Sequence, residues 1–186
     1  MRGARSLTSG EIELANSVFG DAIDLARVRI VRGKWWLLQP RNVAMAPTGN
    51  IHFHPHGELW SDDFGAEPIH RQGLFIHEMT HVWQSQTRGR FYLPLMRHPF
   101  CRYRYDLVAG RPFDRYGLEQ QAEIVRHSFL QRNGFRPQRA PLLGALEPLL
   151  PFGVGTRCDP SLASNGAQPA LATPTSAGRS SRSLIM

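Results

Sequence analysis

The sequence predicts an α+β domain in which a small twisted sheet packs against two main helices. Three observations predict this fold class. Arginine alternates with apolar residues in "ARVRIVRG", and a second alternating stretch, "IHFH", occupies residues 51–54. Apolar residues then recur at helical spacing from Ile69 to Gln86 and from Tyr116 to Gln131. The chain has 186 residues, of which 41% are hydrophobic, so it can bury one core, which we place at residues 1–150.

The first expected element is a short amphipathic helix in "TSGEIELANSVFG". Thr8 or Ser9 can cap its start, and Gly20 ends it. Its apolar positions are Ile12, Leu14, Ala15, Val18 and Phe19.

Three short strands are expected next. The first runs across Val28 and Ile30 to a turn at Arg32-Gly33. The other two, Val43–Ala46 and Ile51–His54, lie on either side of the turn sequence "PTGN". A small sheet therefore precedes the two long helices.

The two long helices have recognisable ends. The run "TRGR" breaks the first after Gln86, and Asn133-Gly134 closes the second. From Pro151 onward Gly, Pro, Ser, Ala and Thr dominate. We expect residues 151–186 to be a disordered tail, because this composition cannot bury enough apolar surface to offset the entropy of ordering.

Composition limits the class of protein. The net charge of +7 comes almost wholly from arginine; it suits a solvated surface, or acidic partners such as nucleic acid or anionic lipid. Cys101 and Cys158 are far apart and form no CxxC motif, which argues against a disulfide scaffold or a cysteine zinc site. The N-terminus lacks the apolar run of a signal peptide, and no segment is long enough for a membrane span. We expect a soluble protein made in the cytoplasm.

The stretch "FIHEMTHVWQ", residues 75–84, contains an HExxH motif. In a helix, His77 and His81 lie one turn apart on one face, so both imidazoles can reach one zinc ion. Glu78 then points to the edge where a zinc-activated water would react, and it can act as general base. Two histidines of a buried helix that bind no metal are the alternative explanation.

A catalytic zinc site needs a third protein ligand. In "LEQQAEIV", Glu119 and Glu123 are four residues apart and share a helix face that is otherwise apolar or small. We expect Glu119 to bind the zinc and Glu123 to accept the ring N–H of a ligating histidine. The reverse assignment, with Glu123 on the metal, stays open, as does a solvent-exposed pair.

With these motifs, residues 7–130 resemble the zincin metallopeptidases of the gluzincin type, in which an acidic residue follows the third ligand by four positions. The order "ARVRI", "NIHFHP", "LFIHEMTHVWQSQ" is similar to the peptidase-like core domain of bacterial contractile injection systems. The chain also resembles small proteins related to the valine-glycine-repeat spike of type VI secretion. Glu123 departs from the aspartate that is common at its position.

The resemblance implies a zincin-like fold and a zinc-dependent hydrolase that cleaves amide bonds in a polypeptide or cell-wall peptide. It also implies spike components of a secretion apparatus as partners, with export that needs no signal peptide. In zincins the strand corresponding to Ile51–His54 holds an extended substrate by main-chain hydrogen bonds. The rival function is a non-catalytic, metal-stabilised accessory module of a contractile injection or type VI secretion system.

Other candidate features are weaker. His52, His54 and His56 could form a second metal site. Four tyrosines could include a donor to the oxyanion formed during amide hydrolysis: Tyr92, Tyr103, Tyr105 and Tyr116. Arginine alternates with aromatic residues between residues 96 and 115, which would suit nucleic acid, a third-ranked partner.

Overall fold

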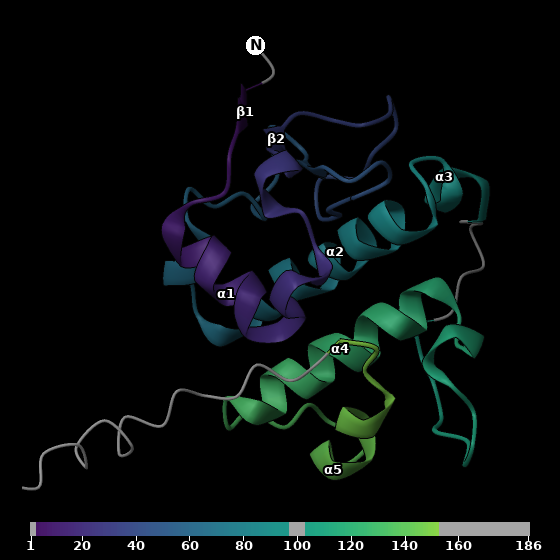
Figure 1. Cartoon of the computed structure of the whole chain (residues 1–186). Helices are drawn as coiled ribbons and strands as arrows, with labels where there is room; N and C mark the ends of the chain where they lie inside the picture. The colour runs from purple at the N-terminus through teal and green to yellow at the C-terminus, as the bar shows by residue number, and fades with distance from the viewer. Residues whose placement is uncertain (1–2, 97–102, 153–186) are drawn as a thin grey trace, which may run out of the picture. The chain divides into compact units, whose positions relative to one another are not determined.

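The computed structural model describes residues 3–96 and 103–152 and has an α+β fold (Figure 1). Its elements are β1 (Gly3–Arg5), α1 (Ser9–Phe19), β2 (Ile30–Arg32), β3 (Ile51–Phe53), α2 (Ile69–Arg88), α3 (Tyr92–Met96), α4 (Leu118–Arg132) and α5 (Leu143–Leu146). The chain divides into two units, Met1–Gly155 and Thr156–Met186, and all these elements belong to the first. Beyond Phe152, the predicted tail lies outside the described residues.

Helix α1 begins as predicted, with Thr8 as its cap in place of the alternative Ser9. The Thr8 hydroxyl accepts the Glu11 N–H at 3.1 Å, and the Glu11 carboxylate accepts the Thr8 N–H at 3.0 Å. Glu11 is fully buried, forms an ion pair with Arg5 at 2.7 Å and accepts the Phe64 N–H at 3.0 Å. One carboxylate therefore joins β1, α1 and the segment before α2, a role that the sequence did not reveal.

The sheet has the order β1-β2-β3, in which β2 is antiparallel to β1 and parallel to β3. The strand predicted at Val43–Ala46 is wrong, because only Met45 forms a bridge, to His52. The buried side chain of Gln39 donates to the carbonyl of Val43 at 2.9 Å, which removes that group from strand pairing. Strand β1 and the short helices α3 and α5 were not predicted.

The two long helices are confirmed, with shifted ends. Helix α2 continues through Arg88 and ends at Gly89, whose φ of 100° is a conformation that favours glycine. Helix α4 begins two residues after Tyr116 and ends at Arg132. It lies along α2 (Figure 1). A methyl group added at Gly73 would be 3.0 Å from a methyl carbon of Leu130. This close packing brings the charged first turn of α4 to the middle of α2.

No helix among the described residues is long and apolar enough to cross a membrane.

Candidate metal centre

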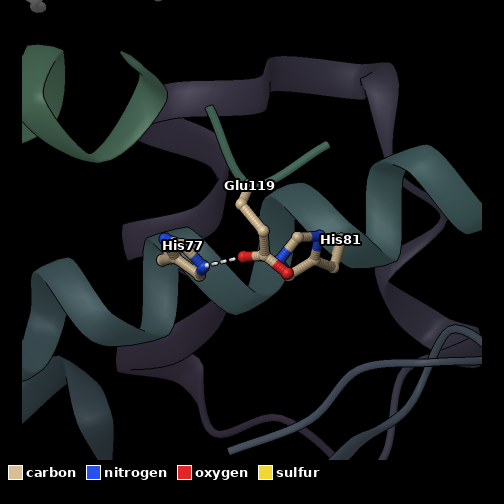
Figure 2. A group of neighbouring side chains, drawn as sticks. All are labelled: His77, His81 and Glu119. Atoms are coloured by element: carbon tan, nitrogen blue, oxygen red, sulfur yellow. Dashed lines mark hydrogen bonds and ion pairs between the residues drawn. The ribbon is translucent and has the colours of Figure 1, made fainter. Parts of the chain in front are cut away.

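Three side chains from α2 and α4 converge at one point. Figure 2 shows the carboxylate of Glu119 reaching between the imidazoles of His77 and His81. Its Oε2 lies 3.2 Å from Nε2 of each histidine, and one ligand atom of each residue lies within 4.8 Å of the others. All three residues are buried. In residues 3–96 and 103–152 they are the only group of three or more His, Cys, Asp or Glu residues close enough to hold an ion.

A chain of hydrogen bonds determines the orientation and tautomer of His81. The Gln121 amide donates to the Tyr116 carbonyl at 2.7 Å, so its oxygen accepts from Gln84 at 2.9 Å. The Gln84 oxygen then faces His81 Nδ1 at 2.8 Å, and that nitrogen must carry the proton. In the neutral imidazole, Nε2 therefore presents a lone pair toward Glu119.

His77 is oriented by the second predicted carboxylate. Glu123 Oε1 lies 2.9 Å from His77 Nδ1, on the side of the ring opposite Glu119. Burial lowers the pKa of His77, but hydrogen bonds with Glu119 and Glu123 outweigh that effect and raise it to about 9. Glu119 thus contacts both Nε2 atoms, whereas Glu123 supports one histidine from behind.

Glu123 is itself held by further side chains. Its Oε2 lies 3.2 Å from His127 Nε2, and Arg126 donates to the same carboxylate at 3.1 Å. His127 Nδ1 is 2.7 Å from the Tyr105 hydroxyl. Burial alone would raise the pKa of Glu123, but hydrogen bonds from His127 and His77 hold it well below its usual range. The carboxylate therefore remains charged beside His77.

The donor set fits a divalent metal ion. Without a cation, the His81 Nε2 lone pair would face a carboxylate oxygen at 3.2 Å in a site almost closed to water. Two imidazole nitrogens and one carboxylate oxygen are also a common set of three protein ligands for zinc. His77, His81 and Glu119 would hold such an ion, and Gln84 and Glu123 would orient the two imidazoles.

Glu78 follows the first histidine on α2 and is 5% exposed. Its Oε2 is buried and accepts no hydrogen bond from any residue that the structure describes. Buried carboxylate oxygens normally have a partner, so this atom has capacity for a water molecule or a substrate group.

A cavity of about 770 Å³ lies on the Glu123 side of the centre. Its lining includes Tyr103, Tyr105, Glu123 and His127.

Of the four tyrosines proposed as oxyanion donors, Tyr103 has its ring stacked on His77, with centroids 6.1 Å apart. Tyr105 bonds to His127, Tyr116 accepts the Val108 N–H, and Tyr92 accepts from Arg88. The role of a tyrosine as oxyanion donor stays a prediction.

The remaining histidine features differ from expectation. His54 Nδ1 accepts the backbone N–H of His56, and the structure does not gather these residues with His52 into a metal-binding group. The expected substrate-binding edge at Ile51–His54 is partly covered. Both main-chain groups of His52 pair with Met45, at 2.8 and 3.1 Å, so they are not available to a peptide.

Gln84, Gln121, His127 and Tyr105 support the centre; the sequence identified Tyr105 only as a possible oxyanion donor and gave none of the four this supporting role. Two of them had a signal in their spacing: Gln84 lies three residues after His81, and His127 lies four residues after Glu123. The other two depend on how separate segments meet in space.

Comparisons with known proteins identify one family of relatives for this chain. No protein-family model matches the chain. Over 140 residues it is 42% identical to the type VI secretion system spike protein VgrG2b of Pseudomonas aeruginosa, a match that covers 70% of this chain and 13% of that protein. The solved effector domain of P. aeruginosa VgrG2b is similar with a TM-score of 0.63 and 36% identity, over 78% of this chain and 81% of that chain. The chain thus spans about an eighth of the length of the curated relative.

Proposed function

This chain belongs to the family of the VgrG2b effector domain, and from that premise we propose that it is an effector module of a type VI secretion system. The relation to Vgr proteins that the sequence predicted is therefore confirmed. The proposed partners are spike components of that apparatus, and the proposed route of export is the apparatus itself. The family relationship is the observation that carries this proposal.

The finer proposal is that the module binds zinc through His77, His81 and Glu119 and hydrolyses amide bonds. When bound, the ion would supply Lewis acidity that activates a water molecule and polarises a carbonyl group. Glu78 would take a proton from the water and deliver it to the leaving amine, because its buried Oε2 has capacity for such a partner. The proposed substrate is a polypeptide or a peptide of the cell wall.

The Glu78→Gln variant separates this hydrolase from a non-catalytic, metal-stabilised module. We expect the variant to keep its fold and about one zinc per chain while losing at least about 100-fold in turnover, since both proton transfers pass through Glu78. Zinc content and hydrolysis of a peptide panel that includes cell-wall stem peptides are the measurements. Glu13→Gln, at an exposed position of α1, is the matched control.

Two outcomes would decide against hydrolysis. One is zinc in the wild-type protein with no cleavage of any peptide in the panel. The other is cleavage that is equal in the wild type and Glu78→Gln. Either result leaves the non-catalytic secretion module, the rival function, as the better account.

A further inference from the structure

The loop after β2 exposes four consecutive apolar side chains. Trp35, Trp36, Leu37 and Leu38 are 41%, 45%, 81% and 70% exposed. Single exposed apolar residues are normal, but a contiguous group of this kind marks an interaction site in a folded protein. We refer to residues 35–38 as the WWLL loop.

Hydrogen bonds from neighbouring residues hold the backbone of the WWLL loop. The buried Gln39 accepts the Trp35 N–H at 2.8 Å and donates to the carbonyls of Val43 and His52 at 2.9 and 3.1 Å. Lys34 Nζ donates to the Leu37 carbonyl at 3.1 Å. The apolar side chains are thus presented by a structured loop, and docking costs less ordering entropy than it would for a flexible segment.

The surroundings of the loop are basic. Between Leu25 and Gly57 the sequence contains five arginine or lysine residues and no aspartate or glutamate. Arg32, Lys34 and Arg41 flank the WWLL loop directly in the sequence, and the two arginines are exposed. Arg32 and Lys34 also line a hollow of about 670 Å³ together with Trp35, Trp36 and Leu37. Cationic groups and apolar rings therefore share one surface.

We propose that the WWLL loop docks on an anionic lipid bilayer. Tryptophan rings favour the boundary between headgroups and acyl chains, and leucines at the same level bury apolar area there. Arg32, Lys34 and Arg41 would meet lipid phosphates, and none of the residues that line the hollow is acidic, so the hollow itself would not repel an anionic surface. An anionic bilayer offers an apolar layer to the tryptophans and leucines and negative charge to the three cationic side chains.

Vesicle binding by the full chain tests the proposal. We expect co-sedimentation with phosphatidylglycerol-containing vesicles that weakens with added salt, and much weaker binding to vesicles of phosphatidylcholine alone. Leu37→Ser combined with Leu38→Ser should weaken binding at least about tenfold. Arg41→Gln should weaken it about fivefold on anionic vesicles and leave binding to neutral vesicles unchanged. Leu142→Ser, at a position 63% exposed outside the loop, is the matched control.

Three results would overturn the proposal. The first is that the wild type does not bind anionic vesicles at low salt. The second is that the wild type and the leucine double variant bind equally. The third is that the wild type is a dimer and the double variant a monomer, while vesicle binding is the same for both. The last would assign the loop to contact between copies of the chain. The assay needs no hydrolysis and works with Glu78→Gln, so its failure is distinct from failure of the proposed function.

Discussion

The pKa of His77 leads to a prediction in which the metal-free protein loses stability as the pH rises, while the stabilisation produced by zinc grows. Hydrogen bonds with Glu119 and Glu123 raise this pKa from 6.5 to about 9 despite burial. The proton on His77 therefore stabilises the metal-free fold. That contribution is fully present below pH 6.5 and is lost as the pH rises to 9.

The magnitude follows from the same two pKa values. A pKa raised from 6.5 to about 9 corresponds to about 3 kcal/mol of stability at most. For a domain of this size, that loss lowers the melting temperature by about 6–12 °C. A metal ion that binds His77 must displace the same proton. The contribution of His77 should therefore raise the apparent affinity of the protein for zinc about tenfold for each pH unit between 7 and 9.

The assay is thermal unfolding at pH 6.5, 7.5 and 8.5, once after removal of metal by a chelator and once with saturating zinc. We expect the melting temperature of the metal-free protein to fall across this series and the increment produced by zinc to grow. Glu119→Gln replaces a charged acceptor of the His77 proton with a neutral one and should flatten the metal-free slope. A metal-free melting temperature that is constant or rises with pH would refute the assignment of this proton to His77.

Three further predictions concern the ligands, the packing and the tail. In a chelator competition, Glu123→Gln should weaken zinc binding about 10- to 100-fold, whereas Glu119→Gln should abolish most of it. The opposite order would mean that Glu123 is the ligand and Glu119 the residue that orients a histidine. Gly65→Ala should destabilise the fold by about 1–3 kcal/mol in chemical denaturation, because the added methyl would lie 2.6 Å from the backbone of α1. Gly144→Ala, where nothing lies within 4 Å, is its control, and equal stability of the two variants would contradict that close contact. Deletion of residues 156–186 should leave zinc content and melting temperature nearly unchanged, and a large loss of stability would show that the tail packs on the domain.

Local sequence patterns were enough to predict the two helices that carry the candidate metal centre. The spacing of His77 and His81 places them on one helix face whatever the rest of the chain does, because α-helix geometry relates residues i and i+4. The spacing of Glu119 and Glu123 does the same for the second helix. The capping box at Thr8 is also local, since the cap and its partner are three residues apart.

The strands were harder to predict, for a physical reason. A strand exists only when another segment pairs with it, and the pairing partner is set by the tertiary structure. Val43–Ala46 has the pattern of a strand, but Gln39 takes one of its carbonyls and only Met45 pairs. Gly3–Arg5 has no strand pattern but pairs with β2.

The sequence by itself determined which side chains are candidate metal ligands, the helices that carry them and the two candidates for the third ligand. It left both Glu119 and Glu123 possible, because either can lie on the same face of α4. The tertiary structure places Glu119 Oε2 against both Nε2 atoms and Glu123 behind His77. That choice depends on how closely and at what register α4 packs on α2, and the close approach of Gly73 to Leu130, outside both motifs, is one part of that packing.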